Sequence, residues 1–209
     1  MTKYDRYQDY VIKDGNFIGE FEEMYQDFED PWDQSFREDL VLSKSVVEKI
    51  IQNGAYKRPY ELGCGLGYFV EKMRNVSGGV SGGMDISATA IRKAKIRFPL
   101  CHFDQGDVLD IGHIKNFKPD CLFMDEITWY VLPKLEKFKM LLVENFSGTM
   151  FIHSLRQYPS GGQSYGREYF EDLNGFMDFF SSAIDIKDWG SFGSTRDPCL
   201  HTFFAGTVK

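Results

Sequence analysis

From residue 58 to residue 180, short apolar runs alternate with amphipathic stretches, and this alternation limits the possible folds more than any other feature. Each run has the length of a β-strand, and apolar residues recur with helical spacing in the stretch that follows. Strict alternation predicts an α/β protein with a mostly parallel sheet that helices cover on both faces. The predicted strands are residues 58–62, 79–86, 100–107, 119–126 and 148–155, and the predicted helices are residues 36–52, 68–76, 87–98, 109–117, 132–146 and 167–180.

The two ends of the chain depart from this alternation. Residues 183–192 and 199–209 are both strand-like with no helical pattern between them, which predicts an antiparallel pair at one edge of the sheet. Residues 1–35 are acidic and aromatic without a clean period, so a loose or partly helical lead segment is expected there. At 209 residues the chain is expected to form a single domain.

Composition argues against several classes of function. The net charge is −7, so a broad basic face for nucleic acid is not expected. The sequence has no apolar leader and no uncharged apolar run of about 18 residues, which favours a cytoplasmic protein with no membrane partner. The four cysteines lack the Cys/His spacing of a metal site, and no bound metal is predicted.

The first strand of the alternating region leads into a glycine-rich turn, YELGCGLGYF, at residues 60–69. Gly63, Gly65 and Gly67 can adopt positive φ and let a ligand approach the backbone closely. The helix that follows offers unpaired N–H groups. Dinucleotide oxidoreductases use GxGxxG at such a turn, but Tyr68 stands where that pattern needs its third glycine. A tight turn without a ligand is the simpler alternative.

Acidic residues end the next three predicted strands. Asp85 can accept hydrogen bonds from both hydroxyls of an adenosine ribose. Asp107 can reach an adenine amino group while Val108 packs on the ring, and Asp125 and Glu126 end the fourth strand. Ligands of open parallel sheets bind at the carboxyl ends of the strands, so these acids are expected to share one site with the glycine turn. Taken singly, each aspartate could merely cap the next turn.

With the glycine turn and these acids in this order, residues 36–209 resemble the class I S-adenosylmethionine-dependent methyltransferases. The resemblance implies a Rossmann-like, doubly wound, seven-stranded sheet that is mostly parallel, with an antiparallel C-terminal pair. It also implies a helical lid formed by residues 1–35 and S-adenosyl-L-methionine as the cofactor. The residues that would bind the cofactor are Glu61, Gly63, Cys64, Gly65, Asp85, Ile86, Asp107, Val108 and Asp125.

Two residues are candidates for a catalytic base. A hydroxyl acceptor benefits from a group that removes its proton, whereas an amine needs only a neutral lone pair. His153, after the fifth predicted strand, and Glu126, after the fourth, are the candidates. A histidine satisfied by backbone contacts is an equally good interpretation of His153, and a divalent ion could replace either base.

Aromatic and basic residues are expected to bind the acceptor. Tyr25 and Trp32 lie in the acidic lead segment, and Tyr130 follows the fourth predicted strand. A polar glycine-rich loop carries three more candidates, which are Arg156, Tyr165 and Arg167. Arginine and tyrosine together suit a sugar or a phosphate-bearing acceptor, although a solvated loop is the alternative.

Two stretches, EDPWDQSF (residues 29–36) and DEITWYVL (residues 125–132), are similar to methyltransferases of nodulation-factor and polysaccharide gene clusters. This similarity favours a small acceptor, with a hydroxyl of a sugar or nucleotide-sugar intermediate of polysaccharide biosynthesis first and an amine second. A nicotinamide-dependent oxidoreductase and a methyltransferase-like subunit without activity are the alternatives from other classes. A monomer or homodimer without a nucleic-acid partner is expected.

Overall fold

A seven-stranded sheet forms the centre of the computed structural model, which describes residues 2–37, 42–158, 166, 169–170, 172–195 and 197–209. The strand order is β5-β4-β3-β6-β7-β9-β8. The first five strands of this order pair in parallel, and β9 is antiparallel to both β7 and β8. The strands are β3 (Pro59–Leu62), β4 (Gly82–Asp85), β5 (His102–Gln105), β6 (Cys121–Asp125), β7 (Met150–Gln157), β8 (Ile184–Ser194) and β9 (Asp197–Val208).

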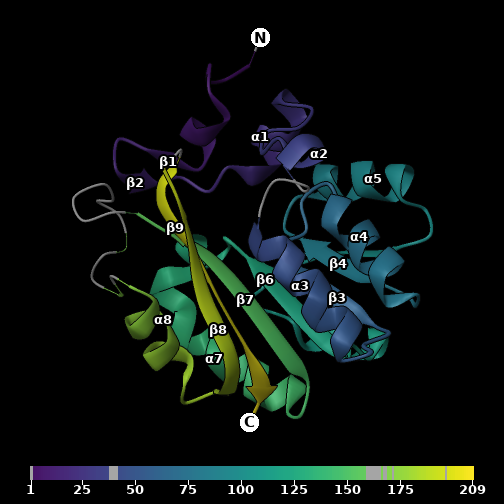
Figure 1. The fold of residues 1–209 in the computed structure, drawn as a ribbon. Coiled ribbons are helices and arrows are strands. Elements are labelled where there is room, and N and C mark those ends of the chain that lie inside the picture. Colours follow the sequence, from purple (N-terminus) through teal and green to yellow (C-terminus); the bar gives the residue numbers. More distant parts are fainter. Residues whose placement is uncertain (1, 38–41, 159–165, 167–168, 171, 196) are drawn as a thin grey trace.

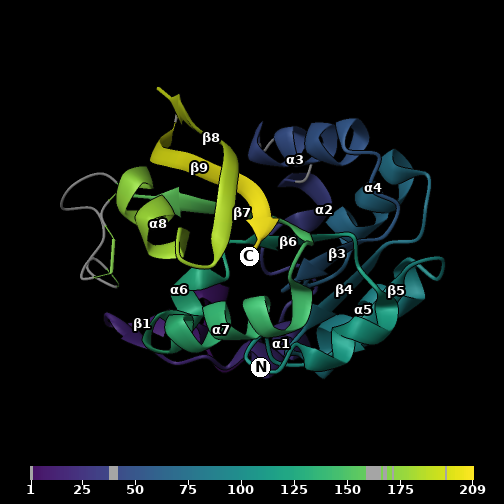
Figure 2. The same cartoon turned by 90° about the horizontal axis from the view of Figure 1, so that it is seen from below.

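Helices cover both faces of this sheet, as the alternation predicts. One hydrophobic cluster joins the sheet to α3 (Leu42–Asn53), α4 (Tyr68–Ser77) and α5 (Ala88–Arg97). A second cluster joins the opposite face to η2 (Gly112–Phe117), α7 (Leu135–Phe146) and α8 (Leu173–Phe180). Figure 2 shows α3 and α4 on one side of the strands and α7 on the other. The short α6 (Thr128–Val131) and η3 (Leu132–Lys134) connect β6 to α7.

The bounds of two predicted helices differ from those in the structure. The last one starts at Leu173 because the Asp172 side chain caps it there, accepting a hydrogen bond from Gly175 N at 2.8 Å. The predicted helix of residues 36–52 corresponds to α3 (Leu42–Asn53), and residues 34–37 belong to α2 (Gln34–Arg37); residues 38–41 lie outside the described part of the chain.

Residues 2–37 lie over the carboxyl ends of the parallel strands (Figure 1), and we call this segment the lid. The lid comprises η1 (Tyr7–Tyr10), the hairpin of β1 (Ile12–Lys13) and β2 (Asn16–Phe17), α1 (Phe21–Asp27) and α2. Its buried residues share a hydrophobic cluster with Leu66 of the glycine turn and Ala90 of α5. The lid is therefore packed onto the elements that surround the predicted cofactor site.

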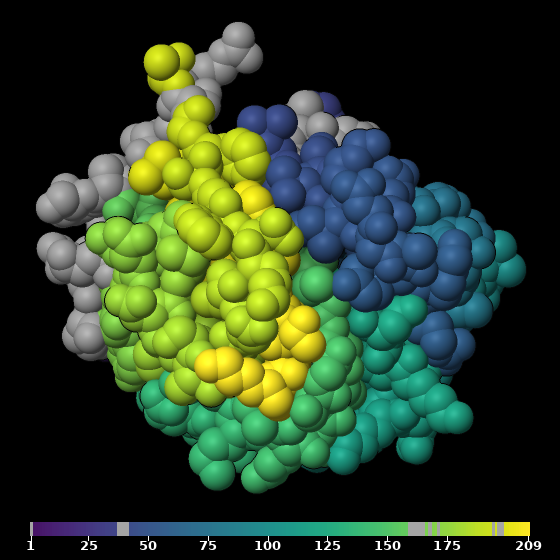
Figure 3. Space-filling model, turned by 60° about the horizontal axis from the view of Figure 1, so that its bottom comes forward, coloured from purple at the N-terminus to yellow at the C-terminus, as the bar shows by residue number. Residues whose placement is uncertain are grey.

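The C-terminal strands extend the sheet beyond β7. Figure 3 shows β8 and β9 at the surface, beside α8 and next to α3. All eight residues of β7 pair with β9, and in this register Arg156 stands opposite His201. No helix in the described ranges combines the length and the apolar character that crossing a membrane requires.

Candidate active site

A cavity of about 1040 Å³ lies between the lid and the carboxyl ends of the parallel strands. Typical ligand pockets have volumes of about 300–1,000 Å³, so this one has room for a nucleoside-sized molecule and a second small molecule. Its floor contains most of the strand-end residues that the sequence predicts, namely Glu61, Gly63, Asp85, Ile86, Asp107, Val108, Asp125 and Glu126. The structure thus brings together side chains from four successive parallel strands.

The glycine turn needs glycine for steric reasons, as Gly63 and Gly65 illustrate. Gly63 has φ +79°, and a Cβ there would lie 2.3 Å from the Ile127 side chain. Gly65 has φ +54°, and a Cβ there would lie 2.6 Å from the Tyr25 hydroxyl. Gly63 lines the cavity, whereas the lid covers Gly65, which is not among the lining residues. The Cys64 side chain is fully buried beneath the turn in the hydrophobic cluster on the α3–α5 face. Of the predicted cofactor-binding residues of the turn, Gly63 thus faces the cavity, while the Cys64 side chain points into the core and Gly65 lies under the lid.

Asp85 connects the glycine turn to the start of α5. Its two carboxylate oxygens accept hydrogen bonds from Gly65 N and from Ser87 N, each at 2.9 Å. Burial raises the pKa of this carboxyl to about 6, although both hydrogen bonds lower it. A carboxylate can accept about four hydrogen bonds, so acceptor capacity remains beyond these backbone bonds. Next to it, Ile86 exposes 51% of its surface at the cavity, and Asp107 accepts a hydrogen bond from Leu109 N at 2.8 Å.

Two adjacent carboxylates follow β6. Asp125 accepts a hydrogen bond from the Ser154 hydroxyl. Glu126 has φ +59°, a left-handed conformation that is uncommon for a residue with a side chain, and its N–H donates to Ser154 O at 3.1 Å. Burial, and then the Asp125 carboxylate, raise the pKa of Glu126 to about 8. A carboxyl that titrates near neutral pH at a cavity can act as a general base.

The position of His153 does not fit the predicted role of general base. His153 lies in the middle of β7, is 0% exposed and does not line the cavity. Four phenylalanine rings surround it, with centroids 4.7 to 5.8 Å from that of the imidazole, and these belong to Phe151, Phe176, Phe180 and Phe204. This apolar surrounding lowers the pKa of His153 to about 3 by burial. The alternative interpretation, a histidine satisfied within the core, agrees with the structure.

Hydrogen bonds also define the tautomer of His153. Its Nδ1 lies 3.0 Å from the carbonyl oxygen of Ser154, and its Nε2 lies 2.5 Å from the Thr128 hydroxyl. Because a carbonyl can only accept, Nδ1 carries the proton and Nε2 accepts from Thr128. Both ring nitrogens are therefore used inside the core.

Aromatic rings from the lid gather around Tyr130 of α6. The ring centroid of Tyr130 lies 5.1 Å from Phe21, 6.1 Å from Phe17 and 6.4 Å from Trp32. All four of these residues line the cavity, as does Tyr25. The predicted acceptor residues Tyr25, Trp32 and Tyr130 thus lie together. Tyr165 and Arg167, which the sequence also predicts, lie outside the described residues.

The predicted acceptor residue Arg156 lies with its Nη2 3.4 Å from Nε2 of His201, and both residues line the cavity. His201 and two other cavity residues are not predictable from sequence motifs. The sequence places His201 only in a last strand, and its position depends on the pairing of β9 with β7. Lys44 and Gln34 line the cavity as well, and only their three-dimensional position reveals them. Across the described ranges, no three His, Cys, Asp or Glu side chains come together as a metal site.

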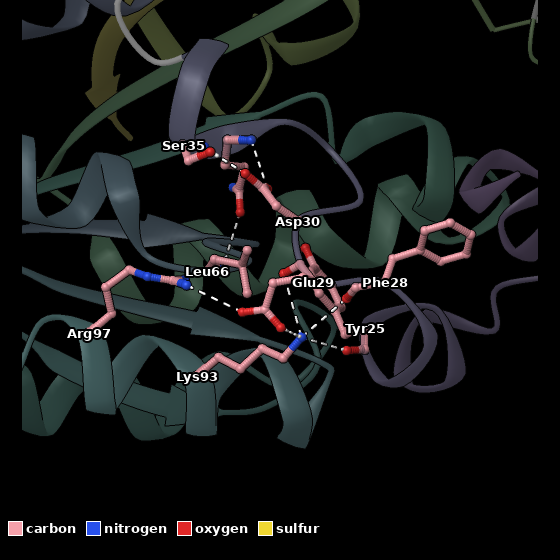
Figure 4. Close-up of polar contacts among 9 residues, drawn as sticks. Tyr25, Phe28, Glu29, Asp30, Ser35, Leu66, Lys93 and Arg97 are labelled. Carbon is pink, nitrogen blue, oxygen red and sulfur yellow. Dashed lines mark hydrogen bonds and ion pairs between the residues drawn. The ribbon is translucent and has the colours of Figure 1, made fainter. Parts of the chain in front are cut away.

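Polar contacts hold the lid on α5. Figure 4 shows Lys93 of α5 pointing at the end of α1, where its ammonium donates to the carbonyl oxygens of Tyr25 at 3.0 Å and Phe28 at 3.1 Å. The same ammonium lies 3.0 Å from the Glu29 carboxylate. At the other end of α1, the Glu22 carboxylate accepts hydrogen bonds from the Ser87 hydroxyl at 2.6 Å and from Thr89 N at 3.1 Å.

Gln34 links the lid directly to the glycine turn. Its side-chain oxygen accepts a hydrogen bond from Leu66 N at 2.8 Å, and its nitrogen donates to Cys64 O at 3.3 Å. This amide therefore satisfies backbone groups on both sides of Gly65. The lid and the turn are one hydrogen-bonded unit.

Comparison with known proteins finds similarity at the level of structure. No protein-family model matches the chain, and no curated protein matches it. The N-methyltransferase NodS from Bradyrhizobium japonicum WM9, in complex with S-adenosyl-L-homocysteine, superposes with a TM-score of 0.62 at 17% identity, covering 86% of this chain and 93% of NodS. Magnesium protoporphyrin IX methyltransferase from Synechocystis PCC 6803, with bound SAM, gives a TM-score of 0.61 at 14% identity and covers 80% and 78%. YjhP from Escherichia coli gives 0.62 at 15% identity and covers 80% and 92%.

At these identities the likeness establishes the fold. The chain has the fold of the class I S-adenosylmethionine-dependent methyltransferases, with the mostly parallel seven-stranded sheet and the antiparallel C-terminal strands of that class. The resemblance that the glycine turn and the strand-end acids predict is thereby confirmed for the fold.

Proposed function

We propose that this chain is a methyltransferase that uses S-adenosyl-L-methionine and acts on a small acceptor. The observation that carries the proposal is the single cavity that joins the glycine turn to acids at the ends of three further strands, within this fold. Asp85 offers acceptor atoms for ribose hydroxyls, and Ile86 and Val108 offer apolar surface for an adenine ring. The donor set and the size of the cavity therefore suit this cofactor.

When bound, the cofactor supplies a methyl group activated on a sulfonium. The residues of the chain would position the acceptor for in-line attack and exclude water, which is most of what such a displacement requires. The lid rings around Tyr130 would cover the acceptor, and Arg156 beside His201 would bind a polar or phosphate-bearing part of it. This combination supports a sugar or nucleotide-sugar acceptor.

For a hydroxyl acceptor, we propose Glu126 as the proton acceptor. It lines the cavity, and its raised pKa of about 8 allows it to take a proton near neutral pH. The pair of carboxylates beside aromatic rings also supports a second acceptor class, an amine, because a cationic amine would be attracted there. One structural neighbour, NodS, is an N-methyltransferase, which is consistent with that class.

Calorimetric titration with S-adenosyl-L-homocysteine tests the cofactor assignment. We expect binding at tens of micromolar or tighter, and no binding of reduced nicotinamide dinucleotide in the same buffer. Binding of the nicotinamide alone would support an oxidoreductase instead. Turnover by the purified chain with a set of nucleotide sugars and amino sugars then identifies the acceptor class, and no turnover with any acceptor would favour a subunit without activity.

A further inference from the structure

His201 and Arg156 form a cross-strand pair at the cavity. They stand opposite each other in the register of β7 and β9, and both line the cavity. The Nη2 atom of Arg156 lies 3.4 Å from Nε2 of His201. Residues directly opposite each other in an antiparallel pair carry their side chains on the same face of the sheet, so the strand register itself brings the imidazole to the guanidinium.

The chemistry of the two groups determines the direction of this hydrogen bond. A guanidinium has only donors, so Arg156 donates and Nε2 of His201 accepts. The imidazole in this arrangement is therefore neutral, with its proton on Nδ1. Eight residue pairs already join β7 to β9, so the strands do not need this side-chain contact for their register.

The guanidinium of Arg156 also lies within electrostatic range of the proposed base. Burial raises the pKa of Glu126, and so does the Asp125 carboxylate, whereas the positive charge of Arg156 lowers it. Burial and the Glu126 carboxylate raise the pKa of Tyr158 as well, and the charge of Arg156 again lowers it. A ligand group bound by Arg156 would therefore lie close to the carboxylate that takes the proton.

The contact with His201 restricts a side chain that would otherwise have many conformations. An arginine has numerous rotamers, and a ligand that must first order such a side chain binds less tightly. The hydrogen bond to His201 restricts the guanidinium before a ligand arrives. A planar guanidinium held in this way suits a phosphate, because two parallel N–H groups can donate to two phosphate oxygens.

We propose that His201 is a positioning residue, which holds the guanidinium of Arg156 at the cavity so that it binds a phosphate of the acceptor. The inference rests on the proposed function, and it favours a phosphate-bearing acceptor over an uncharged sugar or a free amine. A sugar phosphate and a nucleotide sugar both carry the required group, whereas a cationic amine would be repelled by the positive charge of Arg156 near the proposed base.

The test compares ligands that differ only in phosphate, by calorimetry on the chain saturated with S-adenosyl-L-homocysteine. The pairs are UDP with uridine, and anomeric glucose phosphate with glucose. In the wild-type chain we expect the phosphate-bearing member of at least one pair to bind about tenfold more tightly or better. Tighter binding of UDP would indicate a nucleotide sugar, and tighter binding of the glucose phosphate alone would indicate a sugar phosphate.

Variants of the pair separate positioning from simple packing. His201→Leu removes the accepting atom, so the affinity for the phosphate-bearing ligand should fall about threefold to tenfold. His201→Gln can still accept from Arg156 through its amide oxygen and should stay within about twofold of the wild type. Arg156→Met should lose the preference for phosphate, and adding His201→Leu to it should cause no further loss, because His201 acts through Arg156.

Two further variants complete the design. Arg92→Met removes an exposed positive charge from α5, outside the cavity lining, and should leave all affinities unchanged. His201→Val, with a residue that favours strands, takes the place of His201→Leu if that variant does not fold.

The outcomes separate the inference from the proposed function. Equal affinities within both ligand pairs, or tighter binding of glucosamine than of either phosphate-bearing ligand, would overturn the phosphate assignment while the cofactor assignment stands. A loss in His201→Gln as large as in His201→Leu, or a further loss when His201→Leu is added to Arg156→Met, would overturn the positioning role. A wild-type chain that does not bind S-adenosyl-L-homocysteine would instead refute the cofactor assignment itself and remove the basis of this inference.

Discussion

Because His153 is buried, we expect its protonation in the unfolded state to lower the free energy of unfolding of this protein as the pH falls. A histidine in the unfolded chain titrates near pH 6.5, whereas the core lowers the pKa of His153 to about 3. Between these values the unfolded state binds a proton that the folded state does not, so stability falls as the pH is lowered. Each unit of this difference corresponds to about 1.4 kcal/mol, so about 2 kcal/mol should already be lost at about pH 5.

A matched variant isolates this contribution. In His153→Gln the amide can still accept from Thr128 and donate to Ser154 O, but it does not titrate. Its free energy of unfolding should be lower than that of the wild type at about pH 7.5, and the gap should narrow by about 2 kcal/mol at about pH 5. The raised pKa values of Asp85 and Glu126 have the opposite effect, because they increase stability as the pH falls. Both residues are present in the wild type and in the variant, so their contributions cancel in the difference.

Urea unfolding at each pH, followed by circular dichroism, measures the gap. A gap that does not change between the two pH values would mean that His153 titrates normally, and its placement in the aromatic core would then be wrong. Turnover supplies a second check, because a histidine outside the cavity should not determine the pH dependence of the rate.

Three further predictions concern the cavity and the lid. Replacing Asp85 by Ala removes the acceptor for the ribose together with the hydrogen bonds that Asp85 accepts from Gly65 N and Ser87 N, so the affinity for S-adenosyl-L-homocysteine should fall about tenfold to a thousandfold in calorimetry and the free energy of unfolding should fall as well. In Glu126→Gln, turnover of a hydroxyl acceptor should fall by about 10²–10⁴, and the rise of the wild-type rate through pH about 8 should disappear; an unchanged pH profile would exclude Glu126 as the base. Lys93→Met removes the cation that binds the end of α1, so the free energy of unfolding should fall by about 2 kcal/mol and limited proteolysis should cut the lid faster, unlike in the control Lys95→Met on the exposed side of α5.

The strand-end acids could be predicted from the sequence because their positions depend on local patterns. Asp85 and Asp125 each close a short apolar run, and parallel strands bring such ends together at one edge of the sheet. No long-range pairing has to be known. The same reasoning located Gly63, where the turn itself approaches the cavity.

The burial of His153 could not be predicted from local sequence patterns. The sequence predicts that its strand ends at residue 155, which would place His153 near the site. β7 instead continues to Gln157, because β9 pairs with it as far as Leu200, and His153 falls in mid-strand under α8. A strand pairing between residues about 45 positions apart decides this, and no local pattern reports such a pairing.

Lys44 could not be predicted for a related reason. The sequence pattern of residues 36–52 identifies the apolar face of a helix. A lysine in such a helix is usually solvated, so the pattern does not predict that Lys44 is buried. Only the packing of α3 beside the end of β6 directs this lysine into the cavity.

The left-handed backbone of Glu126 has a consequence for efforts to make this protein more heat-resistant. A residue with a side chain in that conformation costs about 1–3 kcal/mol, and burial of its carboxyl adds to the cost when the group ionises. Glycine at position 126 would remove both the backbone cost and the cost of burying the carboxyl. Selection for thermal stability alone would therefore favour glycine there, and the proposed base would be lost. Natural proteins often retain such unfavourable residues where activity needs them. At position 126, heat resistance and turnover should therefore change in opposite directions.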